Sequence, residues 1–208
     1  MKRTFLPLVL ALVSANSFAG VLTDAISSTG NQDYSGTVGL DFDVASNPLL
    51  VTSLGAFDSD ADGFAAGTTI KVSVYDRNTM SIVGTPVTFT STEGTLVGAW
   101  REKSVVPFML AANGQYSIVA EGFNGNDPLF NSGFVSGNPS VATNSAPGLL
   151  TFVGPRYGTA GQYPIHVDGG PNVRYLAGNL GVQAVPEPTS MAALGLGALG
   201  LLKRRKKA

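Results

Sequence analysis

The chain has 208 residues, with 13 Lys and Arg against 14 Asp and Glu, so its formal net charge is −1. Seven bases lie near the two ends, and residues 20–185 hold six bases and 13 acids, a net charge of 6 − 13 = −7. An acidic body argues against a nucleic-acid partner, because phosphate binding requires a basic face. The lack of Cys excludes disulfides, thiolate metal sites and Cys nucleophiles, and a single His, His166, excludes a multi-histidine metal centre.

The N-terminus has the parts of a secretory signal peptide. Two bases follow Met1, and residues 5–13 form an apolar stretch. Ser17 and Ala19 place small residues where signal peptidase reads them, so we expect residues 1–19 to be removed and the mature chain to begin at Gly20. The alternative is an uncleaved anchor, which a nine-residue apolar stretch disfavours because hydrocarbon is about 30 Å thick.

The middle of the chain predicts one all-β domain over residues 20–183. Gly and Pro together make up 26 + 12 residues, as in turn-rich β proteins, and no run of ten or more residues has a helical period. Alternating apolar and polar residues predict strands at 38–44, 70–75, 87–90 and 116–120. Further strand candidates, half-buried or buried and also bounded by turn formers, are 49–57, 149–153 and 173–180. Short strands at such intervals favour a single antiparallel β-sandwich or jelly roll.

Three aspartates at alternate positions precede a glycine: Asp58, Asp60 and Asp62. This spacing begins a calcium loop, in which carboxylates at positions 1, 3 and 5 converge. Position 12 should offer a Glu but is Thr69, so a complete site needs a remote acid such as Asp76 or Glu121. The alternative is an acidic, solvated turn, in which Asp forms local hydrogen bonds. Both interpretations, a calcium site and a plain turn, are open from the sequence.

No catalytic signature stands out in the body. His166 and Asp168 share a face if they lie in a strand, but a Ser-His-Asp hydrolase needs a nucleophile elbow and the chain has no Gly-x-Ser-x-Gly. Glu93, Glu102 and Glu121 lie in no recognisable pattern of paired carboxylates. We therefore predict that the protein is not an enzyme and that His166 is a structural or surface residue.

Aromatic side chains offer another kind of site, because their rings can stack on sugars. The candidates are Trp100, Tyr116, Tyr157, Tyr163 and Tyr175. The alternative is that these rings belong to the core of the sandwich. Carbohydrate binding is therefore the alternative function that the body offers.

The C-terminus has three parts in order. Pro186, Glu187 and Pro188 keep the chain extended, and 12 uncharged residues follow at 191–202. A basic run then acts as a stop-transfer signal, because positive charge stays on the cytoplasmic side: Lys203, Arg204, Arg205, Lys206 and Lys207. Twelve helical residues reach only about 18 Å, so we expect a short apolar helix that holds the chain in the membrane temporarily.

These three parts resemble the PEP-CTERM sorting signal of Gram-negative bacteria that make exopolysaccharide, over residues 184–208. The resemblance implies recognition by an exosortase, a membrane transpeptidase-like enzyme, with removal of the tail near Pro186, Glu187 and Pro188. The product would then be released or attached at the cell surface. The alternative is an ordinary tail anchor, which the shortness of the apolar run disfavours.

The body also resembles the β-sandwich found in many PEP-CTERM proteins, in the segments 54–60, 70–76, 110–122 and 166–171. That resemblance supports the fold and implies no activity. We predict an exported, non-enzymatic protein of the cell envelope or extracellular matrix, which crosses the inner membrane, is anchored transiently by its tail and ends at the surface or outside the cell. The alternative is a carbohydrate-binding module that acts on exopolysaccharide.

Overall fold

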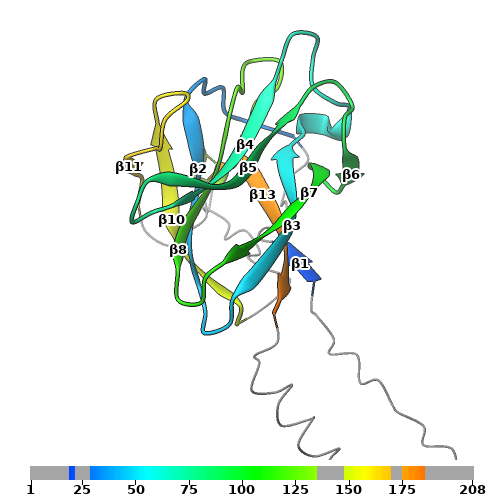
Figure 1. Cartoon of the computed structure of the whole chain (residues 1–208). Helices are drawn as coiled ribbons and strands as arrows, with labels where there is room; N and C mark the ends of the chain where they lie inside the picture. The colour runs from blue at the N-terminus through cyan, green and yellow to red at the C-terminus, as the bar shows by residue number, and fades with distance from the viewer. Residues whose placement is uncertain (1–18, 22–28, 135–147, 170–174, 186–208) are drawn as a thin grey trace, which may run out of the picture.

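The structure is a computed structural model that describes residues 19–21, 29–134, 148–169 and 175–185. These residues form an all-β fold of antiparallel sheets, as predicted (Figure 1). Apart from Ala19, the predicted signal peptide lies outside the described residues, as does the predicted apolar helix of the tail. No helix within these ranges is long and apolar enough to cross a membrane.

One of the two main sheets has five strands in the order β1-β13-β3-β7-β6. Their bounds are β1 (Ala19–Val21), β13 (Gly178–Ala184), β3 (Leu49–Phe57), β7 (Trp100–Leu110) and β6 (Thr95–Val97). The short edge strand β1 contains the predicted signal-peptidase junction and pairs with β13, with Ala19 opposite Gln183. The first and last strands described are therefore neighbours, and β1 lies beside the C-terminal part of β13 (Figure 1).

The other main sheet has six strands in the order β11-β10-β2-β8-β4-β5. Their bounds are β11 (His166–Val167), β10 (Leu150–Gly158), β2 (Thr37–Val44), β8 (Gln115–Glu121), β4 (Ile70–Asp76) and β5 (Ser81–Phe89). Two further strands, β9 (Phe130–Asn131) and β12 (Tyr175–Leu176), pair with each other, and η1 (Ser59–Ala61) and η2 (Ser132–Phe134) are single 3₁₀ turns.

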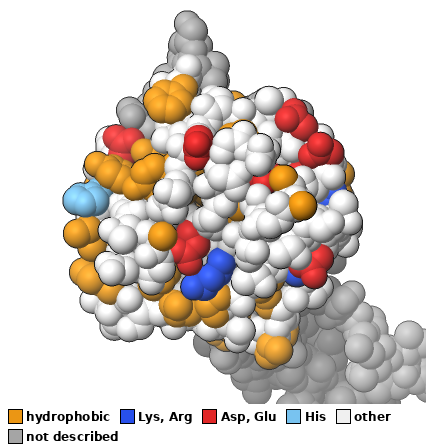
Figure 2. Space-filling model, turned by 90° about the horizontal axis from the view of Figure 1, so that it is seen from above, with side chains coloured by type: hydrophobic (Ala, Val, Ile, Leu, Met, Phe, Trp, Pro, Cys, Tyr) orange, Lys and Arg blue, Asp and Glu red, His pale blue; other side chains and the backbone are white. Residues whose placement is uncertain are grey.

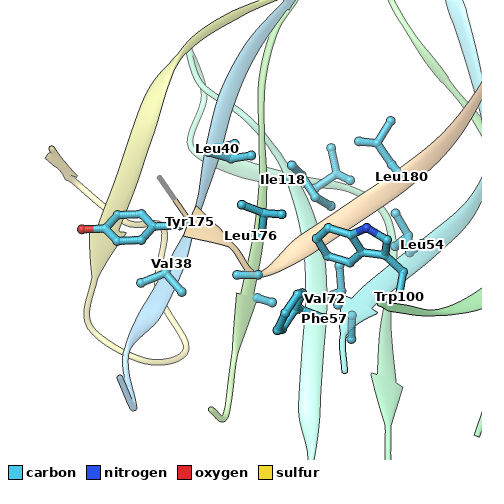
Figure 3. Packing of buried hydrophobic residues seen from close by; sticks show 14 of the residues in the cluster. Val38, Leu40, Leu54, Phe57, Val72, Trp100, Ile118, Tyr175, Leu176 and Leu180 are labelled. Carbon is cyan, nitrogen blue, oxygen red and sulfur yellow. The ribbon is translucent and has the colours of Figure 1, made fainter. Parts of the chain in front are cut away.

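The two main sheets pack over a shared hydrophobic core (Figure 3). Leu40 and Ile118 from the six-stranded sheet and Leu54 from the five-stranded sheet are each at most 1% exposed. Gly178 of β13 lies close to the six-stranded sheet: a Cβ there would be 3.1 Å from Ile118 Cγ1 and 3.3 Å from Val72 Cγ1. In β2, the alternate residues Val38, Leu40, Phe42 and Val44 belong to this core, which explains why apolar residues alternate in that part of the sequence.

Four predicted strands are confirmed within one residue at each end by β2, β3, β4 and β8. The prediction at 149–153 identified only the first part of β10, which continues to Gly158. The prediction at 173–180 is divided in the described residues into β12 and β13, with Ala177 between them. These boundaries were wrong, because a local pattern of apolar and turn-forming residues does not mark where one strand ends and the next begins.

We predicted no strand over β7, although it has 11 residues. Its early charges hide the alternation, and Pro107 lacks the N–H that a sheet ladder uses. In the structure the register with β3 shifts between the pairs Val51↔Phe108 and Ser53↔Ser104, and Pro107 lies in this irregularity. A bulge of this kind accommodates proline without ending the strand.

A lysine ties the two main sheets together where β5 and β7 come close. Lys103 of β7 donates a hydrogen bond from Nζ to the carbonyl oxygen of Thr88 at 2.7 Å and lies 5.0 Å from the centre of the Phe89 ring. It also pairs with Glu93 at 3.0 Å, and the hydrogen bonds that Lys103 and Thr90 donate to the Glu93 carboxylate lower the pKa of this group. The contacts join a strand of each sheet along one side of the sandwich.

Candidate functional site

The turn that contains the three aspartates is built around a buried ion pair. The carboxylate of Asp58 is fully buried and accepts a hydrogen bond from Arg101 Nε at 2.6 Å. It also accepts the backbone N–H of Gly63 at 3.1 Å, which closes the turn. The Arg101 guanidinium in addition donates to the carbonyl oxygens of Ala61 and Thr92. It therefore joins β7 to the turn and to the segment that precedes β6.

The other two aspartates do not converge with Asp58 on one point. Asp60 is exposed and accepts hydrogen bonds from Thr29 Oγ1 at 2.6 Å and Ser59 Oγ at 3.2 Å, and Asp62 is exposed. Among the described residues, no group of three or more His, Asp or Glu side chains is placed to hold a metal ion. Of the two remote acids that could complete the site, Glu121 pairs with Lys71, and Asp76 accepts the backbone N–H groups of Asn78 and Thr79. These contacts favour the acidic turn over the calcium site.

Because the aspartates do not converge on a metal site, chelation is expected to leave the melting temperature of the protein unchanged. A calcium ion bound only by the folded state would raise the melting temperature, and its removal would lower it. The measurement is thermal unfolding with EDTA and with added calcium chloride. A melting temperature that rises with calcium, and no longer does so in Asp60→Ala, would establish the calcium site and contradict the turn.

A different candidate is a solvent-open hollow of about 440 Å³ at the end of β10, next to the edge strand β11. Its volume is within the range of small-molecule sites, about 300–1,000 Å³. We call it the aromatic hollow. The residues that line it are Tyr34, Ser35, Gly36, Tyr157, Gly158, Thr159, Ala160 and His166.

Three rings of the aromatic hollow pack on one another. The rings of Tyr157 and His166 are stacked, with centroids 5.1 Å apart and planes at 26°. Tyr34 meets Tyr157 edge-on at 6.4 Å and donates its hydroxyl to the carbonyl oxygen of Gly158 at 3.1 Å. A Cβ on Gly36 would lie 2.3 Å from that same oxygen, so only glycine allows the segment before β2 to approach β10 this closely.

A polar network on the other side of β10 holds the loop that continues the hollow. Arg156, the neighbour of Tyr157, donates from Nε to the buried carboxylate of Asp41 at 2.6 Å and from Nη1 to the carbonyl oxygen of Pro164 at 3.2 Å. Asp41 also accepts Ser117 Oγ at 2.5 Å. The hydrogen bond to Pro164 fastens the far end of loop 159–165 to the sheet.

The same loop is held at two further points. The backbone N–H of Gly161 donates to Glu121, which also pairs with Lys71 Nζ at 3.1 Å. The ring of Tyr163 packs 5.5 Å from Tyr75 and 5.2 Å from the Arg156 guanidinium. Burial raises the pKa of the Tyr75 phenol above its ordinary value, against the opposing charge of Lys71.

The predicted aromatic candidates separate into two groups. Trp100, Tyr116 and Tyr175 are buried, between 3% and 6% exposed, and belong to the core. Tyr163 secures the loop, and Tyr157 lines the hollow. The sequence analysis missed Tyr34, which lies in no predicted strand; its proximity to Tyr157 depends on a pairing of segments more than 120 residues apart.

The two residues of the His-Asp pair have separate surroundings. His166 is exposed and lines the aromatic hollow, whereas Asp168 accepts a hydrogen bond from the Tyr175 hydroxyl at 2.6 Å. Surface placement of His166 agrees with the prediction made from the sequence.

The predicted sorting tail follows the last strand without a linker. β13 ends at Ala184, and the N–H of Val185 donates to the carbonyl oxygen of Pro48 at 3.1 Å. The sorting residues 186–188 and the basic run 203–207 lie outside the described residues. The body therefore holds its chain in place up to the residue before the motif.

This chain combines an all-β body of antiparallel sheets with a C-terminal segment of the sorting type. Residues 184–207 match the family model of the PEP-CTERM protein-sorting motif, which confirms the resemblance drawn from the tail. The motif implies export, a transient stage at the membrane and an exosortase as the processing partner. A search of curated proteins found no match.

Proposed function

We propose that this chain is a non-enzymatic protein of the cell envelope or extracellular matrix, which an exosortase delivers to the cell surface or the medium by processing its tail. The observation that supports this most directly is the match of residues 184–207 to the sorting motif, immediately after the last strand. A weak apolar run between an extended motif and a basic end pauses the chain in the membrane and does not hold it permanently.

The pairing of β1 with β13 supports the same function. Ala19 lies opposite Gln183. The predicted signal-peptidase junction, which follows Ala19, is therefore on the strand next to the one that leads into the sorting tail, and the two points are close in space. Adjacent strands are about 4.8 Å apart. The segments beyond both ends therefore leave the body at one place, and once the signal peptide has been removed the tail alone holds the body at the outer surface of the membrane.

Removal of the tail tests this function. In a host with the exosortase, the wild-type chain is expected to lose its tail, Glu187→Ala to remain membrane-bound, and a deletion of residues 203–207 to be mis-sorted, because each change removes one part of the signal. Cell fractionation and intact-mass measurement give the result. Thr189→Ala, which leaves all three parts in place, serves as the control and should be processed normally.

Recovery of most of the wild-type protein with residues up to Ala208 still attached would show that the tail is a lasting anchor. Normal processing of Glu187→Ala would contradict the role of the Pro-Glu-Pro motif. Both outcomes concern the tail only and leave any binding by the body to a separate measurement.

A second candidate function is the carbohydrate-binding module. The observation that favours it is the aromatic hollow, in which Tyr157, one of the rings selected for sugar stacking, contacts both Tyr34 and His166. Binding of exopolysaccharide is compatible with the sorting function, because delivery by the tail would bring the body to the matrix in which such polymers lie.

A further inference from the structure

We propose that the aromatic hollow is a binding site for neutral pyranose units of a polysaccharide. This inference rests on the carbohydrate-binding candidate and is independent of the sorting of the tail. Aromatic rings, small residues and hydroxyl groups lie together in the hollow. None of the sequence motifs described above assigns a ligand to this combination.

The rings provide the apolar part of the site. Tyr34 and Tyr157 are half-buried and His166 is exposed, so part of each side chain faces solvent while the contacts between the rings fix their positions. The C–H bonds of a pyranose ring form an apolar, weakly positive face that packs on the negative face of an aromatic ring. In Figure 2 the one His of the chain lies at the margin of the body, with hydrophobic side chains next to it.

The remaining lining residues fit the hydroxyl groups of a sugar and no charged group. Ser35 and Thr159 are exposed and carry hydroxyls that both donate and accept hydrogen bonds. None of the residues that line the hollow is Lys, Arg, Asp or Glu. With a body charge of 6 − 13 = −7, this surface offers no compensation for an anionic ligand, so a neutral polymer is favoured over an acidic one.

The site is also pre-ordered. The hydroxyl of Tyr34 is bonded to Gly158, and the loop that begins at Thr159 is fastened through Pro164 to Arg156 and through Gly161 to Glu121. A ligand therefore does not have to order the loop when it binds, which lowers the entropic cost of association. Because Ala160 and His166 are exposed at the rim, a polymer can extend beyond the units that occupy the hollow.

The test is native affinity electrophoresis of the exported protein in gels that contain a neutral polysaccharide. The probes are dextran, hydroxyethylcellulose, galactomannan and mixed-linkage β-glucan, with alginate as the acidic comparison. We expect at least one neutral probe to retard the wild type. His166→Ala and Tyr157→Ala should each weaken that binding about fivefold or more, since a ring contact worth about 1 kcal/mol corresponds to about fivefold.

The matched control is Phe134→Ala, which removes an exposed aromatic ring outside the hollow, 65% exposed, and should bind like the wild type. Thermal unfolding followed by Trp100 fluorescence shows whether each variant is folded, and His166→Ala, at an exposed position, keeps the test valid if Tyr157→Ala unfolds. Failure of every neutral probe to retard the wild type, retardation by alginate alone, or equal binding by His166→Ala would overturn the proposal. Tail processing of His166→Ala should match the wild type, which separates this outcome from a failure of the sorting function.

Discussion

Replacing Asp58 by Asn is expected to destabilise the folded body by about 3–5 kcal/mol. The substitution keeps the shape of the side chain but removes the negative charge that faces the Arg101 guanidinium, and both side chains are buried, 0% and 10% exposed. Breaking one partner of a buried pair leaves the other charge without compensation, which costs more than the pair contributes. The lost stability comes from the contact between β7 and the turn that contains Asp58.

Urea unfolding followed by tryptophan fluorescence gives the measurement. Trp100, the one tryptophan of the chain, precedes Arg101 and packs edge-on against Phe57 with ring centroids 5.6 Å apart, so it reports on this part of the core. The matched control is Asp62→Asn, the same change at an exposed position of the same turn, which should alter the free energy of unfolding by less than about 0.5 kcal/mol. Equal losses in the two variants would show that the ion pair does not stabilise the fold.

Gly122→Ala is expected to lower the free energy of unfolding by about 3 kcal/mol or more, because two effects add. The residue has φ +103°, where L-residues are strained, and a Cβ there would lie 2.1 Å from the carbonyl oxygen of Thr69. That oxygen belongs to the backbone directly before β4, which pairs with β8, so it moves only if the two strands separate. The cost therefore falls on the middle of the six-stranded sheet.

Gly67→Ala separates the two effects. Gly67 has a similar φ of +89° but nothing lies within 4 Å of a Cβ at that position, so the variant should show only the conformational cost, about 1–2 kcal/mol. Denaturation midpoints of the two variants and the wild type give the comparison. If both variants lose the same stability, the close approach of Gly122 to Thr69 contributes nothing and the strand contact is wrong.

The sorting tail could be predicted from the sequence because its parts are read in chain order. Pro186, Glu187, Pro188, the apolar run and the basic end need no distant partner to be recognised, and the family model matches the same region. The strand at 38–44 could also be predicted, because its alternate residues face the core and produce a local pattern of period two, and 49–57 could be predicted because it is an apolar stretch bounded by turn formers. Local rules were sufficient in both cases.

Only the tertiary structure shows which residues the aspartate and aromatic side chains contact. The same Asp58 fits a calcium loop by spacing, but its partner Arg101 is 43 positions away and turns it into half of an ion pair. Tyr34 and Gly158, which meet in the aromatic hollow, are 124 positions apart. Likewise, Pro107 argues against a strand until the pairing of β7 with β3 shows the irregularity that accommodates it. Contacts between distant segments depend on the strand order, and no local pattern records that order.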